Sequence, residues 1–324
     1  MVRTSRMGKL AKVALLLGMS QGLAFAQAPY PSKPVWVISP LGSSGAVEVM
    51  GRLVTRRMSD SMGQQFVVES RIGAGGTVGH EAAARAAPDG YTLLLTGSGY
   101  TVMPWIYSIK YDPLKDLVPI SQMSLGSYLL MVTRSLPAKT VKDLVALAKS
   151  RPGALNFGSS GVGSSVHFAT ETLAATAGIK FTHVPYKDLG RSYIDLIAGE
   201  IQLIMSNTIS ALPHVKTGKA RALGVTSSRR LAAIPDIPTV SESGLPGFSA
   251  AVWTAIFAPG KTPPEIVARL NSEVVKAVNH PEMVARAEAE GGEPVQPLEQ
   301  FRQTIHNELN SNKKIAHALN IKPE

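Results

Sequence analysis

Two Gly/Ser loops are the segments of this sequence whose residue types could bind an anion. The first is Gly42-Ser43-Ser44-Gly45, the second is Gly158-Ser159-Ser160-Gly161-Val162-Gly163-Ser164-Ser165, and a helical pattern follows each. Such a loop leaves backbone N–H groups free at the positive end of a helix dipole, where a carboxylate or a phosphate can bind. Two loops more than a hundred residues apart predict one small anion held between two lobes.

The segments that must position these loops alternate between strand and helix patterns, which indicates an α/β fold. The apolar run 35–39 is typical of a buried parallel strand, and residues 47–62 have helical spacing. Similar strand and helix patterns repeat over 65–96 and again over 129–226, and a helical tail begins near Pro263. We therefore predict parallel sheets covered by helices.

The order of these segments predicts two lobes joined by two crossings, near 121–126 and 226–230. One lobe comprises residues 27–122 and 229–324, and the other comprises residues 123–228. Ligands of open α/β sheets bind beyond the carboxyl ends of the strands, and both Gly/Ser loops follow such ends. Each lobe thus contributes one loop to a predicted cleft.

The first 26 residues have the pattern of a secretory signal peptide. Four basic residues and no acid precede the apolar run 13–17, and Ala24-Phe25-Ala26 is a small-x-small cleavage site. The apolar run is far shorter than the roughly 20 residues that a membrane-spanning helix needs. We expect cleavage after Ala26 and export to the periplasm, which lowers the formal net charge from +10 to +6.

Composition excludes several classes of function. The chain has no cysteine, which excludes disulfides and a cysteine-linked lipid anchor. Basic residues are scattered and aromatic residues make up only 6% of the chain, whereas a nucleic-acid-binding face would gather both. No His, Cys, Asp and Glu set has metal-ligand spacing, and the segment 73–79 departs from the dinucleotide-binding glycine pattern. We expect a monomer without cofactor or metal.

Several short motifs carry a resemblance to a known family. They are Tyr30-Pro31-Ser32-Lys33-Pro34, Gly73-Ala74-Gly75-Gly76, Ala87-Pro88-Asp89-Gly90-Tyr91, Tyr111-Asp112-Pro113, Pro137-Ala138-Lys139-Thr140, Asn156-Phe157-Gly158, His183-Val184-Pro185-Tyr186-Lys187 and Asp236-Ile237-Pro238-Thr239-Val240. In this order they resemble the Bug family, the TctC-like periplasmic solute receptors of tripartite tricarboxylate transporters. The resemblance implies a type II periplasmic binding protein fold, with two Rossmann-like lobes that close on a small carboxylate, and delivery of that ligand to the transporter's membrane subunits.

The chain departs from the family pattern at two places that bear on the ligand. Pro40-Leu41-Gly42-Ser43-Ser44-Gly45-Ala46-Val47-Glu48 stands where the family usually has Pro-Phe-Pro-Ala-Gly-Gly-Ser-Thr-Asp, and Met205-Ser206-Asn207 replaces Phe-Asp-Asn. Loss of an acid from the rim of the pocket favours a second negative group on the ligand, because like charges repel strongly in a partly dry cleft. Glu48 mildly favours an ammonium or hydroxyl group on the ligand instead, because a carboxylate near the site would attract such a group.

By overall resemblance we expect an aromatic dicarboxylate such as terephthalate. Leu41, Val162 and Trp253 are candidates to wall the flat apolar slot that an aromatic ring needs. An aliphatic dicarboxylate or an amino acid remains an alternative ligand, and a ligand sensor that feeds a membrane kinase remains an alternative function.

The predicted ligand-binding residues come from the two loops and from the strand ends beside them. They are Leu41, Gly42, Ser43, Ser44, Gly45, Glu48, Ser98, Ser160, Gly161, Val162, Gly163, Ser164, Ser165, His167, Asn207, Thr208 and Trp253. His167 and Trp253 could equally be core residues. Ser164 or Ser165 with His167 and Asp195 has the residue types of a hydrolase triad, but the spacing is unsuitable and a Gly-x-Ser-x-Gly elbow is missing. We therefore predict no catalytic residues.

Overall fold

The computed structural model describes residues 30–40, 46–187, 189–289, 292–321 and 323. The predicted signal peptide and the first Gly/Ser loop, with Leu41 to Gly45, lie outside the described residues. Residues 33–324 form one compact unit, to which the contacts below belong.

The strands pair in the order β2-β1-β3-β9-β4-β7-β5-β6, and β8 pairs with β4 beside this path. Their bounds are β1 (Val35–Ser39), β2 (Phe66–Ser70), β3 (Thr92–Gly97), β4 (Leu117–Thr133), β5 (Asn156–Ser159), β6 (Thr182–Pro185), β7 (Leu203–Asn207), β8 (Ala220–Val225) and β9 (Ala251–Pro259). β1 pairs in parallel with β2 and β3, and β5 pairs in parallel with β6 and β7. The prediction of parallel strands is confirmed for these pairs.

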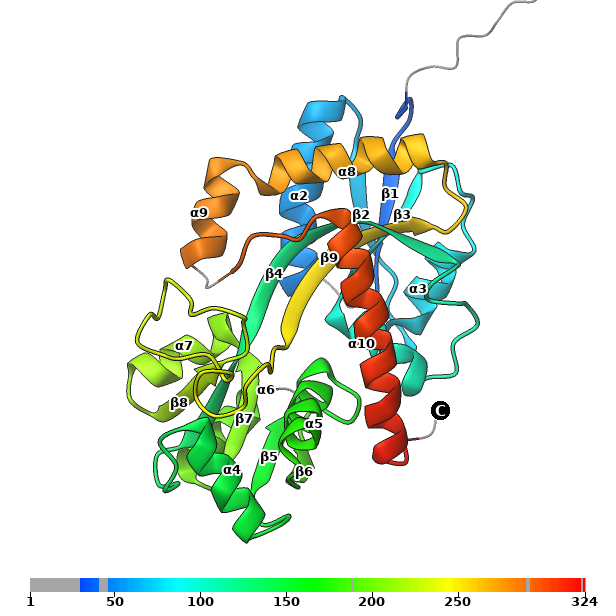
Figure 1. The fold of residues 1–324 in the computed structure, drawn as a ribbon. Coiled ribbons are helices and arrows are strands. Elements are labelled where there is room, and N and C mark those ends of the chain that lie inside the picture. Colours follow the sequence, from blue (N-terminus) through cyan, green and yellow to red (C-terminus); the bar gives the residue numbers. More distant parts are fainter. Residues whose placement is uncertain (1–29, 41–45, 188, 290–291, 322, 324) are drawn as a thin grey trace, which may run out of the picture. The chain divides into compact units, whose positions relative to one another are not determined.

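The long strand β4 makes the rest of the sheet antiparallel, which the sequence analysis did not predict. Residues 117–127 of β4 pair with β9, whereas residues 128–133 pair with β7 and β8. β9 also pairs antiparallel with β3. β4 therefore passes from the strand group that contains β1 to the group that contains β5 (Figure 1).

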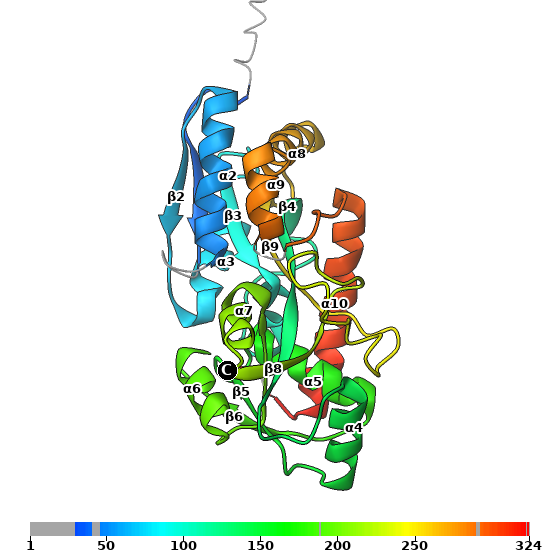
Figure 2. The ribbon, with the colours of Figure 1, turned by 90° about the vertical axis from the view of Figure 1, so that its left-hand side faces the viewer.

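Helices cover both groups of strands (Figures 1 and 2). They are α2 (Ala46–Met62), α3 (Thr77–Ala84), α4 (Val141–Ser150), α5 (Ser165–Ala177), α6 (Leu189–Ala198), α7 (Thr208–Lys216), α8 (Pro264–Val278), α9 (Pro281–Ala289) and α10 (Leu298–Ala318). Three short 3₁₀ turns, η1 (Ala74–Gly76), η2 (Ser98–Thr101) and η3 (Met103–Trp105), complete the set of described helical segments.

The apolar faces of the two strand groups pack against different helices. Ile38 of β1 and Phe257 of β9 form one core with Phe301 of α10. In the other group, Leu130 and its neighbours on β4 pack with α4 and α5, and Leu129 and its neighbours pack with α6 and α7. Successive residues of a strand point to opposite faces, so β4 separates α5 from α7.

Local sequence explains where the helices beside the strand ends begin. The hydroxyl of Ser164 accepts a hydrogen bond from the His167 amide at the start of α5, and the side chain of Asn207 accepts one from the Ser210 amide at the start of α7. Side-chain oxygens at this position satisfy amides that have no partner within the helix. Thus α7 begins directly after β7, and α5 begins after the loop that follows β5, both at residues predicted to bind the ligand.

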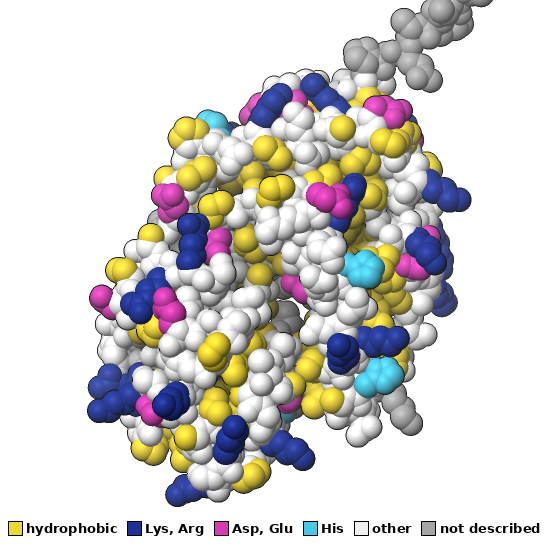
Figure 3. Space-filling view, in the orientation of Figure 1, with side chains coloured by type: hydrophobic (Ala, Val, Ile, Leu, Met, Phe, Trp, Pro, Cys, Tyr) yellow, Lys and Arg dark blue, Asp and Glu magenta, His cyan; other side chains and the backbone are white. Residues whose placement is uncertain are grey.

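The basic side chains on the surface are scattered, as the sequence analysis predicts. Lys and Arg side chains are spread over the face drawn in Figure 3 and form no continuous stripe on it. In the part of the chain that the structure describes, every helix is too short or too polar to cross a membrane.

Candidate functional site

Two predicted site residues from distant segments meet at one tyrosine. Ser98 begins η2 directly after β3, Ser165 begins α5, and Tyr128 belongs to β4, which runs between them. Burial raises the pKa of the Tyr128 phenol above its ordinary value of 10.0, and the nearby side-chain hydroxyl groups of Ser165 and Ser98 act in the opposite direction. Three hydroxyl groups therefore converge at the N-terminus of α5.

The second Gly/Ser loop uses much of its own backbone to hold its shape. The hydroxyl of Ser159 accepts a hydrogen bond from the Gly161 amide at 3.1 Å and donates one to the Gly161 carbonyl at 3.0 Å. The Gly163 amide donates to Nδ1 of His167 at 3.1 Å, and the Ser164 amide donates to the Gly161 carbonyl. Three loop amides that could have faced a ligand are thus occupied within the loop.

Two amides that remain for a ligand lie in the first turn of α5. The amides of Ser165 and Val166 precede the first hydrogen bond within the helix, and the structure gives them no partner among its described residues. The dipole of this 13-residue helix favours a negative charge at the same end. The start of α5, beside Tyr128, is therefore a candidate position for an anion.

Two stacked histidines support the loop from within the protein. The rings of His167 and His183 lie 3.9 Å apart between centroids, and the ring of Phe157 stacks on His183 at 4.8 Å. Nε2 of His183 lies 2.6 Å from the hydroxyl of Ser159. Burial lowers the pKa of both histidines to about 4, and for His167 the neighbouring His183 lowers it further. Both rings are therefore neutral near pH 7.

A glycine is required at position 163 for two reasons. Its backbone has φ of +81°, in the region that favours glycine, and a Cβ atom there would lie 2.1 Å from Cδ1 of Ile106. Ile106 follows η3, so the loop packs closely against the same segment that carries Ser98. This close approach helps to keep the start of α5 near η2.

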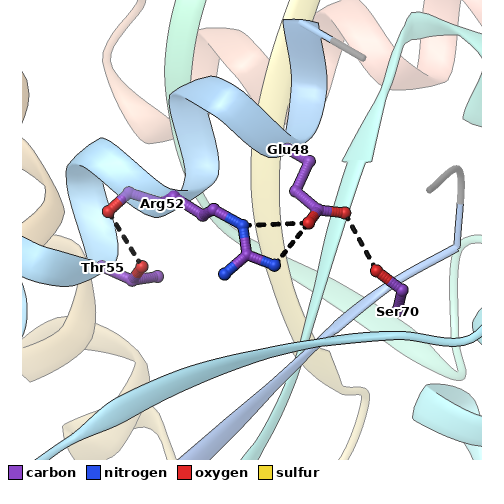
Figure 4. A network of polar contacts seen from close by, with 4 residues as sticks. All are labelled: Glu48, Arg52, Thr55 and Ser70. Carbon is purple, nitrogen blue, oxygen red and sulfur yellow. Dashed lines mark hydrogen bonds and ion pairs between the residues drawn. The ribbon is translucent and has the colours of Figure 1, made fainter. Parts of the chain in front are cut away.

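Glu48 does not face a ligand as a free charge. Its buried carboxylate accepts hydrogen bonds from Nε and Nη2 of Arg52 at 2.9 and 2.6 Å and from the hydroxyl of Ser70 at 3.2 Å (Figure 4). Burial alone would raise the pKa of Glu48, but the neighbouring hydroxyl of Ser39, the hydrogen bonds from Arg52 and Ser70 and the charge of Arg52 hold it below 4.5. Since its charge is neutralised locally, Glu48 provides little argument against an anionic ligand.

Asn207, Thr208 and Trp253 belong to a second part of the site. They line a pocket of about 830 Å³ whose walls come from α2, α7, α9 and the strands β4 and β9. The hydroxyl of Thr208 donates a hydrogen bond to the carbonyl of Ser127 at 3.0 Å, which fixes the start of α7 on β4. Ser127 directly precedes Tyr128 in β4, and because successive residues of a strand point to opposite faces, Thr208 and the hydroxyl cluster lie on opposite faces of β4.

Trp253 is a core residue whose indole is already bonded. It is 1% exposed, and its N–H group donates to the carboxyl oxygens of Glu308 at 3.2 and 3.1 Å. Burial raises the pKa of Glu308 to about 7, although bonds from Trp253 and Thr101 act in the opposite direction. A role for the Trp253 ring as an open wall for an aromatic ligand gains no support from this packing.

The structure brings together only some of the residues predicted from the sequence. Ser98 and Ser165 meet at Tyr128, Gly161, Gly163, Ser164 and His167 shape the adjoining loop, and Asn207 and Thr208 line the pocket. Ser160 and Val162 lie on the exposed side of the loop, and Val162 is 59% exposed. The sequence analysis missed Tyr128, and it quoted His183 only as part of a family motif. Neither residue lies in a Gly/Ser loop or at the end of a strand, which were the signals used for most of the others.

The residues of the hydrolase alternative are not assembled. Asp195 forms an ion pair with Arg191 at 3.0 Å and accepts a hydrogen bond from Tyr186. Nδ1 of His167 faces the Gly163 amide, as described above. Among the described residues, no group of three His, Cys, Asp or Glu side chains could hold a metal ion.

An α/β fold with helix N-termini and hydroxyl groups converging between two groups of strands defines a solute-binding protein of the periplasmic type. The chain belongs to the tripartite tricarboxylate transporter family of receptors, which it matches over residues 50–321. As a receptor family it consists of binding proteins and not of enzymes, in agreement with the predicted lack of catalytic residues.

Individual relatives agree with this assignment. Protein BugT of Bordetella pertussis is 37% identical over 272 residues, which cover 82% of each chain. Two solved structures are also similar, R. palustris Rpa4515 with adipate (TM-score 0.75, 31% identity, 91% of this chain and 100% of that one) and MatC of Rhodopseudomonas palustris with bound malate (TM-score 0.72, 29% identity, 89% and 100%). The Bug resemblance and the type II fold expected from the sequence are therefore confirmed, whereas the identity of the ligand is not.

Proposed function

We propose that this protein is a periplasmic receptor that binds a small carboxylate at the start of α5 and delivers it to the membrane subunits of its transporter. The observation that carries the proposal is the convergence of Ser98 and Ser165 on Tyr128. The amides of Ser165 and Val166 and the three hydroxyl groups supply neutral donors for one carboxylate. Hydrogen bonds to a charged acceptor are each worth more than bonds between neutral groups.

Closure of two lobes would complete this site. Ser98 belongs to the proposed lobe 27–122 and 229–324, and Ser165 belongs to the proposed lobe 123–228. A ligand that bridges them favours the arrangement in which both lobes contact it. Closure also excludes water, which strengthens each bond between a donor and the carboxylate. We propose that the closed arrangement is the form that the transporter recognises.

Several features support a dicarboxylate as the ligand. The similar proteins Rpa4515 and MatC were solved with adipate and malate, which are both dicarboxylates. In this chain Glu48 is neutralised by Arg52, and Ser206 is a buried neutral residue bonded to Tyr193. A second carboxylate would therefore meet little repulsion from these positions. Terephthalate is our first candidate within this class, and the receptor acts as an exported monomer in this proposal.

Titration calorimetry against aliphatic and aromatic mono-, di- and tricarboxylates tests the proposal. We expect Tyr128→Phe to weaken the best ligand by about 10-fold or more, because a hydrogen bond to a charged group is worth about 1.5–3 kcal/mol. Tyr111→Phe is the matched control, since Tyr111 is also buried and, among the described residues, its hydroxyl donates a hydrogen bond to the sulfur of Met103 at 3.5 Å and to no other group. Equal affinities of the two variants, or binding of amino acids alone, would contradict the proposal.

A further inference from the structure

A carboxyl group of α10 lies beside the hydroxyl groups proposed to bind the ligand. Oε2 of Glu308 is 3.0 Å from Oγ1 of Thr101 in η2, the turn that begins with Ser98. The charge of Glu308 also raises the pKa of the Tyr128 phenol. Its carboxyl accepts hydrogen bonds from the indole of Trp253, and its side chain keeps partial exposure. Glu308 is thus linked to two of the three proposed ligand-binding hydroxyl residues.

The hydrogen bonds around Glu308 are all satisfied at once only when its carboxyl carries a proton. The Thr101 hydroxyl has a single proton, yet its oxygen lies 3.0 Å from Oε2 of Glu308 and 2.9 Å from the carbonyl of Ser98. A protonated Glu308 can donate to Thr101, which then donates to Ser98 and accepts from Nδ2 of Asn312 at 3.0 Å. An ionised Glu308 competes with the Ser98 carbonyl for that one proton. The protonation state of Glu308 therefore bears on the turn that carries Ser98.

No cation compensates the charge of Glu308 among the described residues. Its partners Thr101, Trp253 and Asn312 are uncharged. The titratable groups on the elements that pack against α10 are Tyr100 of η2, Tyr128 of β4, and His167 and Glu171 of α5. None of them is a cation near pH 7, and none shifts the pKa of Glu308, which burial raises to about 7. Glu308 is therefore close to half protonated at neutral pH.

We propose that Glu308 takes up one proton from solvent when a carboxylate binds at the start of α5, so that the receptor binds its ligand together with a proton. This inference rests on the proposed function and adds a residue that sets affinity according to pH. The ligand stays ionised, and the proton goes to the Glu308 carboxyl. Two carboxylates near Tyr128 would repel each other in a partly dry site, and protonation of Glu308 removes one of these charges. It also leaves the Thr101 hydroxyl free to hold the Ser98 carbonyl.

Affinity should then follow the fraction of receptor molecules whose Glu308 is protonated. With a pKa of about 7 for the free receptor, affinity falls by about 20-fold between about pH 6.5 and about pH 8.5. At about pH 8 each bound ligand takes up about 0.9 protons. His167 and His183 have pKa values of about 4 and stay neutral over this range, and free carboxylates stay ionised. The change therefore does not come from the stacked histidines or from the ligand.

Titration calorimetry with adipate at about pH 8, in two buffers of different ionisation enthalpy, measures the proton uptake directly. Glu308→Gln should take up none and should bind equally well across the pH range, because its amide can accept from Trp253 and donate to Thr101 as the protonated carboxyl does. Glu171→Gln is the matched control. Glu171 is a half-buried carboxyl of α5 whose pKa is also raised by burial, and it has no described hydrogen bond to η2. This variant should keep the wild-type uptake.

Adipate binding to the wild type without proton uptake would overturn the inference and leave the proposed function in place, and this measurement does not depend on any variant. Uptake that persists in Glu308→Gln, or that disappears in Glu171→Gln, assigns the proton to another group and also overturns it. If adipate does not bind, the tightest ligand of the carboxylate panel takes its place. If the wild type binds no carboxylate at any of these pH values, the proposed function fails and the inference fails with it. Circular dichroism checks that both glutamine variants are folded.

Discussion

Acidification should destabilise this protein through the stacked pair His167 and His183. Both have a folded-state pKa of about 4 and an ordinary value of 6.5, so the unfolded chain binds more protons than the folded one between these values. Their contribution to stability is therefore complete above about pH 6.5, decreases as the pH falls toward 4, and changes no further below it. For one such histidine the free energy of unfolding decreases by about 2 kcal/mol between neutral pH and about pH 5.

His167→Asn isolates this contribution. The side-chain oxygen of asparagine can still accept the hydrogen bond from the Gly163 amide, but the residue no longer titrates and the stack with His183 is lost. We expect the variant to be less stable near neutral pH, because a stacked ring pair is worth about 0.5–1.5 kcal/mol beyond its burial. Its stability should fall by about 2 kcal/mol less than that of the wild type on going to about pH 5.

Urea unfolding followed by tryptophan fluorescence at a series of pH values measures both quantities. His80 also has a pKa lowered by burial to about 4, but it is present in both proteins and cancels in the comparison. His317→Asn removes an exposed histidine from α10 and serves as the control. If wild type and His167→Asn lose the same stability on acidification, the neutral stacked pair is refuted as the group that titrates.

Two further predictions concern the loop and the N-terminus. Gly163→Ala should reduce carboxylate binding by about 10-fold or more, because its Cβ atom would meet Ile106 and the loop could not place the start of α5. Gly178 has φ of +62° and open space around it, so Gly178→Ala controls for the cost of positive φ alone. Equal binding by both variants would count against the close approach between Gly163 and Ile106. Mass spectrometry of the protein exported by its host should give a chain that begins at Gln27, and an uncleaved N-terminus would exclude the predicted signal peptide.

Periodicity predicted the elements that are regular and local. The strand β1 and the helices α2 and α8 begin within about one residue of the predicted positions, because continuous apolar runs and helical spacing mark them directly. β4 was predicted only from residue 129 onward. Its first half contains Pro119, Gly126 and several serines, and its register shifts near Pro119 and Gln122. Irregularities of this kind remove the period on which a strand prediction depends.

The site was predictable only as far as it is local in sequence. The Gly/Ser loop and the start of α5 could be located because a strand, a glycine-rich turn and a helix follow one another. The occupied amides of Gly161 and Gly163 could not be foreseen, since they depend on where Ser159 and His167 direct their side chains. Tyr128 lies within a strand, and judged from the sequence alone a tyrosine at such a position is typical of the core.

The neutrality of the residues proposed to contact the ligand at the start of α5 has a consequence for its release. Ser98, Tyr128 and Ser165 are hydroxyl donors, and the histidines behind the loop are uncharged near pH 7. When a carboxylate binds there, the ligand is charged and the protein donors are neutral. The hydrogen bonds are still charge-assisted, and no buried Lys or Arg partner adds its own desolvation cost. If the proposed lobes close on the ligand, much of the affinity depends on exclusion of water, so reopening weakens every bond together. This dependence on closure would allow release of the ligand in the proposed delivery to a membrane transporter.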